Sequence, residues 1–292
     1  MIEMTRFILD GFFYASILFL ISSGLTLIFS VAGIINLAHG ALYMLGAYIA
    51  AVLIKSLINT PYAILAFPIA ALIIGLIGII IERGFIKWIY EREFVYQLLL
   101  TFGLALVLSD ITRITFGTEP IYVTKLYIHA GIIDILGSPY PVYNFIVMAV
   151  TFLISGLMWF IMYKTRAGKI IRACALDREM SEAIGINTSR VFTLTFFMGS
   201  ALAGISGALV VPQSAAMLGI DADALIESFI VIVIGGVGSI KGAFIGSLLI
   251  GLIRAFGIAL FPEIELAIVY LVMAAVLLIR PRGLFGKEYR VA

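Results

Sequence analysis

The chain consists largely of apolar runs that are each long enough to cross a lipid bilayer as a helix. A helix needs about 20 apolar residues to span the hydrocarbon core, because it rises 1.5 Å per residue. A continuous helix also pairs its backbone hydrogen-bonding groups without water. We therefore predict an all-α integral membrane protein, a polytopic bundle of about eight or nine transmembrane helices, some of them broken. The predicted spans are 7–31, 35–57, 62–81, 95–113, 142–163, 190–212, 225–239, 242–261 and 265–280.

The composition excludes the water-soluble classes of protein. Residues of the set AVILMFWYC make up 63% of the 292 residues, and charged residues make up only 12%, about half the usual share. A soluble globule of this size would have too few polar groups to cover its surface. Soluble enzymes, nucleic-acid binders and disordered chains are therefore excluded. We expect a single transmembrane domain over residues 1–292.

Basic residues are concentrated in alternate connections between the predicted spans. Fourteen of the 19 lysines and arginines fall in the connections 82–94 and 164–190, at Lys241 and in the tail 280–292. Cytoplasmic loops of membrane proteins carry an excess of Lys and Arg. We therefore expect these segments on the cytoplasmic side, including the tail 280–292, and the N-terminus on the outer side.

Glycines interrupt one pair of predicted spans and form a stripe along the second of them. A run of three glycines within 235–239 separates the spans 225–239 and 242–261. In lipid, glycines at four-residue spacing let helix backbones approach closely. The favoured interpretation is packing within the chain, and a dimer interface or a flexing joint is the alternative. The candidate packing or hinge positions are Gly235, Gly236, Gly238, Gly242 and Gly246.

No residue pattern predicts catalysis or a bound cofactor. The zinc-protease, nucleophile-elbow and phosphate-loop motifs are missing from the sequence. A single cysteine, Cys174, leaves no internal disulfide and no cysteine-cluster metal site. We expect no catalytic residue, no metal and no cofactor in this chain, so that any ATP would be used by partner subunits.

Ionisable residues inside the apolar runs are few. Asp10 is the only clear carboxylate candidate for ion coupling. We expect Arg254 to face the bundle interior or to extend to the interface rather than to grip a substrate carboxylate. Asp110 and Arg113 are three residues apart near a helix end, which favours an ion pair over a proton relay.

A polar stripe interrupts the second predicted helix. Asn36, His39, Gly40 and Tyr43 share one helical face, and such a face should not contact lipid. One interpretation is that these residues form hydrogen bonds at a fixed helix crossing. The other is that they line a translocation path, and the four residues are our candidates for that path.

The basic connection 164–190 predicts one short amphipathic helix. Apolar residues recur at helical spacing from 170 to 184, and Gly185 is a helix stop signal. A helix with basic flanks can lie on anionic lipid. Three acidic residues within this helix fit a protein partner better, so we predict that it docks into a groove of a cytoplasmic protein.

Several strings resemble, in order along the chain, those of the permease subunits of branched-chain amino acid ABC importers. Together they span almost the whole sequence, which makes the resemblance specific. The chain departs from the family pattern at Lys241 and Arg254. The matching strings are Gly-Leu-Thr-Leu-Ile-Phe-Ser at 24–30, Ile-Asn-Leu-Ala-His-Gly at 35–40, residues 43–48, 173–191 and 235–243, and Arg-Pro-Arg-Gly-Leu-Phe-Gly at 280–286.

The resemblance implies the ABC importer permease fold and a multi-pass subunit of the cell (inner) membrane that works by alternating access. The implied partners are a second related permease subunit, two cytoplasmic ABC ATPase subunits, an extracytoplasmic binding protein and membrane lipid, with no nucleic acid. Branched-chain amino acids are the implied substrates, and urea, short amides or other amino acids are the alternative. A stand-alone secondary transporter is an alternative of another class.

The resemblance also assigns a role to the connection 164–190. Within it, residues 170–187 correspond to the loop that couples the permease to the ATPase. The candidate coupling residues are Arg172, Asp177, Glu182, Ala183, Gly185 and Asn187.

Overall fold

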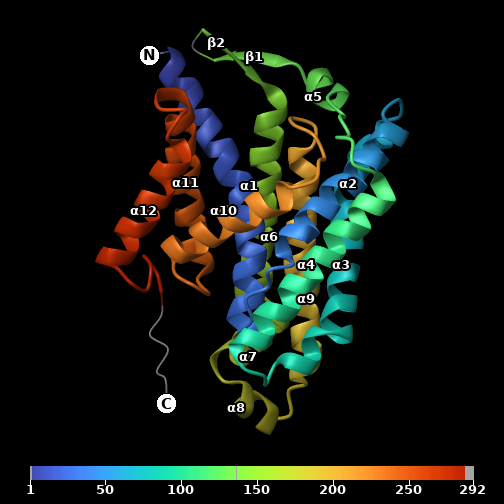
Figure 1. Ribbon diagram of the computed structural model, residues 1–292, viewed down its shortest axis with the longest axis vertical. Coiled ribbons are helices and arrows are strands. Elements are labelled where there is room, and N and C mark those ends of the chain that lie inside the picture. The colour runs from blue at the N-terminus through green and yellow to red at the C-terminus, as the bar shows by residue number, and fades with distance from the viewer. Residues whose placement is uncertain (1, 136, 287–292) are drawn as a thin grey trace.

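In a computed structural model that describes residues 2–135 and 137–286, long helices form an elongated bundle (Figure 1). Two 3-10 turns (Pro61–Leu65 and Ile86–Ile89) flank the third helix. The helices are α1 (Ile2–Ala32), α2 (His39–Leu57), α3 (Ala66–Gly84), α4 (Phe94–Phe116), α5 (Lys125–His129), α6 (Val142–Lys164), α7 (Arg166–Leu176), α8 (Arg178–Ala183), α9 (Thr188–Val210), α10 (Ile220–Gly235), α11 (Ile240–Leu260) and α12 (Glu265–Ile279).

The predicted membrane bundle is confirmed, with fewer full-length spans than the eight or nine predicted from the sequence. Within the described residues, seven helices have the length and apolar composition needed to cross a bilayer: α1, α2, α3 with its leading 3-10 turn, α4, α6, α9 and α11. α12 is apolar but has only 15 residues. α10 has 16 residues and begins at Ile220, five residues before the predicted span 225–239, with two aspartates in its first turn.

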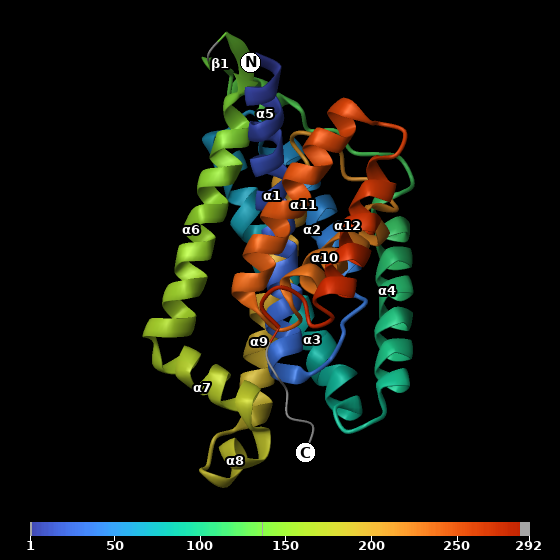
Figure 2. The ribbon, with the colours of Figure 1, turned by 90° about the vertical axis from the view of Figure 1, so that its left-hand side faces the viewer.

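The centre of the bundle is formed by α1, α2 and α9, which bury most of their surface. Glycines allow this close packing: Gly46 of α2 lies against the backbone of Gly204 in α9, and Gly207 of α9 lies against the carbonyl of Tyr43. A side chain at these glycines would overlap the facing backbone. By contrast, α4 and α6 stay largely exposed and stand at opposite edges of the bundle (Figure 2).

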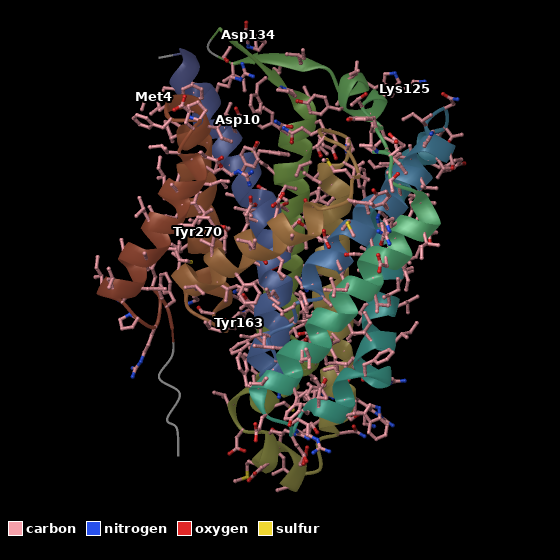
Figure 3. All side chains as sticks on the ribbon, in the orientation of Figure 1. Met4, Asp10, Lys125, Asp134, Tyr163 and Tyr270 are labelled. Atoms are coloured by element: carbon pink, nitrogen blue, oxygen red, sulfur yellow. The ribbon has the colours of Figure 1, made fainter. Side chains whose placement is uncertain are left out.

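The two ends of the molecule carry different small elements. α5 and an antiparallel pair of strands, β1 (Ile132–Ile135) and β2 (Ser138–Pro141), lie at one end, with Ile132 opposite Pro141. Figure 3 shows Lys125 and Asp134 at this end. α7 and α8 lie at the opposite end (Figures 1 and 2). The sequence did not predict the strand pair.

Candidate functional site

The segment between α6 and α9 folds into two short helices instead of the single helix predicted over 170–186. The break is at Asp177, whose backbone is extended (φ −155°, ψ 105°) and whose carboxylate accepts a 2.8 Å hydrogen bond from the amide of Met180. A side-chain oxygen in this position caps the N-terminus of the next helix. Asp177 therefore ends α7 and starts α8. We call residues 166–187 the α7–α8 segment.

Arg172 attaches α7 to the end of α6. Its guanidinium donates a hydrogen bond to the carbonyl of Met162 and lies over the ring of Tyr163, 4.9 Å from the ring centre. Ile171 and Cys174 are buried on the same side of α7. Arg172 thus faces back toward α6 and fixes the direction in which α7 leaves it.

Glu182 attaches α8 to the start of α9. Its carboxylate accepts hydrogen bonds from the hydroxyl of Thr188 at 2.6 Å and from Arg178 at 3.1 Å. These two donors hold the pKa of the Glu182 carboxyl below its ordinary value. Arg178 also lies 3.6 Å from Glu91 in the connection between α3 and α4, and 5.3 Å from the ring centre of Phe192.

Gly185 and Asn187 make the turn from α8 into α9. Gly185 has a φ of +86°, a left-handed conformation that glycine adopts without strain. The amide of the next residue, Ile186, donates to the carbonyl of Ser181 at 3.0 Å. The side chain of Asn187 accepts from the amide of Arg190 at 3.0 Å and caps α9. Ala183 is exposed at the end of α8.

A row of apolar side chains projects from this segment, and the candidate list from the sequence missed it. Leu176, Met180 and Ile184 are 78%, 60% and 68% exposed. Leu176 is the last residue of α7, whereas Met180 lies in α8 and Ile184 at its end, so the break at Asp177 separates the first side chain from the other two. Burial of Cys174 and Ser181 shows that a different face packs against the bundle. The row is therefore free to contact another protein.

The structure buries all four residues of the polar stripe between helices. Nε2 of His39 donates a 3.0 Å hydrogen bond to the carbonyl of Ile21 in α1, while Nδ1 has no partner among the described residues. Gly40 lies directly against the carbonyl of Asp221 in α10. Tyr43 contacts α9 through its backbone. These contacts hold α2 against α1, α9 and α10, and a role in the path stays a prediction.

Asn36 does not lie on the helical face predicted for it. α2 begins at His39, and Asn36 belongs to the turn that joins it to α1. Its side-chain oxygen accepts a 3.2 Å hydrogen bond from the amide of Ala38. Asparagine forms such local bonds in preference to continuing a helix, and Gly33 turns the chain just before it with a φ of +69°.

The glycine-rich joint between α10 and α11 is tightly packed. The backbones of Gly235 and Gly242 touch, so a Cβ at either position would overlap the other. Gly246 lies against the carbonyl of Val231 one turn further along. Gly236 and Gly238 have φ values of +100° and +79° and reverse the chain between the two helices.

The described part of the tail folds back onto this joint. The amide of Leu284 donates to the carbonyl of Ile234 at 2.8 Å, and that of Phe285 to the carbonyl of Gly235 at 2.9 Å. The tail thus pairs carbonyls that the end of α10 leaves without an intrahelical partner. The remainder of the predicted tail, 287–292, lies outside the described residues.

The helices α10, α11 and α12 share a partly buried charge cluster. Arg254 of α11 forms ion pairs with Glu227 of α10 and with Glu265 of α12, where Nε lies 3.0 Å from Oε1. It also lies 5.2 Å from the ring centre of Tyr14 in α1. Arg254 therefore faces neighbouring helices, as predicted. The sequence pattern did not indicate the pairing of Arg254 with Glu227 and Glu265.

Comparison with known proteins places this arrangement in a family. The family described as branched-chain amino acid transport system / permease component matches residues 7–279. The high-affinity branched-chain amino acid transport system permease protein LivH of Salmonella typhimurium is 32% identical over 286 residues, which cover 92% of this chain and 91% of that protein. The corresponding protein BraD of Pseudomonas aeruginosa is 31% identical, with coverage of 96% and 95%.

An archaeal relative extends the similarity over nearly the whole chain. The probable branched-chain amino acid transport permease protein LivH of Methanocaldococcus jannaschii is 27% identical over 98% of this chain and 94% of that protein. No solved structure matches the chain significantly.

Proposed function

The chain belongs to the family of permease components of branched-chain amino acid transport systems, and we propose that it forms part of the membrane path of an ATP-driven importer of these amino acids. It is a multi-pass membrane protein and a transport subunit, not an enzyme. The substrate class named for LivH and BraD supports leucine, isoleucine and valine as the cargo.

The proposed assembly contains this chain, a second related permease subunit, two cytoplasmic ABC ATPases and an extracytoplasmic binding protein. The concentration of basic residues around α7 and α8 supports a cytoplasmic location for that end of the molecule and for the C-terminal tail. The binding protein would then meet the opposite end, which carries α5 and the two strands.

The observation that carries the proposal is the exposed apolar row on the α7–α8 segment. Docking of exposed apolar helix side chains into an apolar groove is a common mode of protein recognition, and here two short helices supply such side chains. Leu176, Met180 and Ile184 provide the row. We assign this segment to the contact with the ATPase.

The anchors of the segment explain how a docked ATPase would move the bundle. Arg172 ties α7 to α6, and Glu182 ties α8 to α9. α9 packs along α1, α2 and α3 in the centre of the molecule. A displacement of α8 would therefore reach the central helices. ATP drives transport only if it binds more tightly to one of the two states of the assembly.

Reconstitution in liposomes tests the proposal. We expect ATP-dependent uptake of leucine when the second permease, the ATPases and the binding protein are present, and none with this chain alone. Uptake by this chain as the sole protein would instead support a stand-alone secondary transporter. ATP-driven uptake of urea or short amides in preference to leucine would contradict the proposed substrate.

A further inference from the structure

A groove runs between α6 and α11 at the side of the bundle. Two adjoining hollows of about 390 and 740 Å³ form it. They share five lining residues, so the groove is continuous from one hollow to the other. Sites for small organic ligands have volumes of about 300–1,000 Å³, so the groove is large enough for part of a lipid. The shared lining residues are Met162, Tyr163, Ile240, Lys241 and Phe285.

The smaller hollow has an apolar wall made of bulky side chains. Phe19 of α1, Met158 and Trp159 of α6, and Phe244 and Ile245 of α11 form most of it. Transmembrane helices pack against each other best where small residues let their backbones approach. A wall of phenylalanine, methionine and tryptophan side chains offers no such surface. It fits a flexible acyl chain better than a helix of another subunit.

The larger hollow brings two cationic side chains to one end of the groove. Lys241 lies in the first turn of α11, and Arg172 reaches in from α7. None of the described residues that line the two hollows is acidic. Lys241 is exposed and forms no ion pair within the described part of the chain. The groove is therefore apolar along its length and positive at one end.

Aromatic residues indicate that this positive end lies at the membrane surface. Trp159 and Tyr163 are exposed near the end of α6, and the ammonium group of Lys164 lies 5.5 Å from the ring centre of Trp159. Tryptophan, tyrosine and lysine gather in this way at the level of lipid headgroups. Figure 3 shows Tyr163 toward the end of the molecule that carries α7 and α8.

We propose that this groove binds an anionic phospholipid. The acyl chain lies against Trp159 and Phe244, and the headgroup phosphate contacts Lys241 and the guanidinium of Arg172. The lipid then touches both α6, which leads into the α7–α8 segment, and the start of α11 beside the glycine-rich joint. This binding site is independent of which amino acid the assembly carries.

Native mass spectrometry of the purified full-length chain tests the site. Phosphatidylglycerol and phosphatidylcholine of the same acyl length are titrated against the wild type and three variants. Lys241→Gln removes the charge, and Ser155→Phe fills the apolar hollow. Lys169→Gln is the matched control, because Lys169 is also an exposed lysine at this end of the molecule but lines neither hollow.

We expect the wild type to retain phosphatidylglycerol over phosphatidylcholine, and Lys241→Gln to weaken phosphatidylglycerol binding about fivefold, the effect of one basic residue at a membrane surface. Ser155→Phe should weaken binding of both lipids, and Lys169→Gln should match the wild type. Equal loss in Lys241→Gln and Lys169→Gln would overturn the proposal. Full displacement of the lipid by glycerol phosphate alone would also overturn it. Displacement of the lipid by the second permease subunit would overturn it too, because the groove would then be a subunit interface.

Discussion

The hydroxyl of Thr188, in the first turn of α9, donates a 2.6 Å hydrogen bond to the carboxylate of Glu182 in α8. Glu182 thus makes two polar contacts, this bond to α9 and an ion pair with Arg178 within α8, and Arg178 in turn lies 3.6 Å from Glu91 in the connection between α3 and α4. A cation at position 182 would remove both contacts and repel Arg178. The geometry of α8 therefore depends on the negative charge of Glu182.

Glu182→Lys should uncouple ATP hydrolysis from uptake. The reconstituted assembly is expected to insert and to hydrolyse ATP, while leucine uptake per ATP hydrolysed falls several-fold. Glu179→Lys is the control, because it makes the same change of charge at an exposed residue of α8 three positions before Glu182. Equal uptake by the wild type and Glu182→Lys would argue against the assignment of this segment to the ATPase.

The contact between α8 and α9 should also depend on pH. Because the pKa of Glu182 is lowered in the folded protein, its carboxylate stabilises the contact above the ordinary value of 4.5, and this contribution is lost as the pH falls through the lowered pKa. Spin labels at Met180 and Ser189, in a Cys174→Ser background, measure the separation. We expect the distribution of distances between the two labels to stay constant from pH 7 to 4.5 and to broaden below pH 4.5. Broadening between pH 7 and 5 would contradict the prediction.

Gly185 should be sensitive to substitution through its backbone alone. No atom lies within 4 Å of the position where its Cβ would be, but its φ of +86° costs a residue with a side chain about 1–2 kcal/mol. Gly185→Val should therefore impair coupling without reducing expression, and Gly185→Asn should retain more activity because asparagine tolerates this conformation.

Gly156→Val provides the comparison for Gly185→Val. Gly156 lies in α6 with no contact at its Cβ position and no positive φ. Uptake and ATP hydrolysis are measured for all three variants in the reconstituted assembly. If Gly156→Val impaired coupling as much as Gly185→Val, the effect would not come from the turn between α8 and α9.

Local signals in the sequence were sufficient to predict the helices but not all of their ends. Apolar length predicted the spans, because hydrocarbon requires it, and the glycines within 235–239 marked the real break between α10 and α11. The helical spacing of its neighbours predicts Asp177 within a helix. An aspartate can also cap a helix, and the capping bond to Met180 decides between these two roles.

Contacts between distant segments could not be predicted in the same way. Arg254 meets Glu227 and Glu265 only because α10, α11 and α12 pack together. The backbone bonds from the tail to Ile234 and Gly235 likewise involve no side-chain pattern that a sequence displays. The candidate coupling residues were near one another in sequence, yet the structure separates those that anchor the segment, such as Arg172, from those that are exposed.

Arg254→Gln should destabilise the fold more than the loss of a surface pair does. The variant leaves the carboxylates of Glu227 and Glu265 facing each other without a cation, at side-chain exposures of 21% and 14%. Removing one partner of a buried pair costs about 3–5 kcal/mol. Arg113→Gln breaks an exposed pair with Asp110 and should cost less than about 1 kcal/mol.

Thermal melting and denaturant unfolding in mild detergent measure the effect of both arginine variants. We expect a clear fall in melting temperature for Arg254→Gln and almost none for Arg113→Gln. The double variant Arg254→Gln/Glu227→Gln should recover part of the loss, since it removes one of the uncompensated charges. Equal melting temperatures for the two single variants would show that the cluster contributes little to stability.

His39 and Tyr43 allow the two interpretations of the polar stripe to be separated. His39→Ala removes the hydrogen bond to Ile21 and leaves a cavity between α1 and α2, which should cost a few kcal/mol of stability. His39→Gln keeps a side chain that can donate to the same carbonyl. Tyr43→Ala removes a buried ring from α2 at a position whose backbone contacts Gly207 of α9.

Leucine uptake normalised to the amount of folded protein is the deciding measurement for these three variants. If the stripe lines the path, uptake per folded molecule falls in His39→Ala and Tyr43→Ala beyond their loss of stability, and His39→Gln does not restore it, because the imidazole itself is then required. If the stripe only holds the helix crossing, His39→Gln restores the stability and the total uptake that His39→Ala loses. Normal uptake per folded molecule in all three variants would remove these residues from the translocation path.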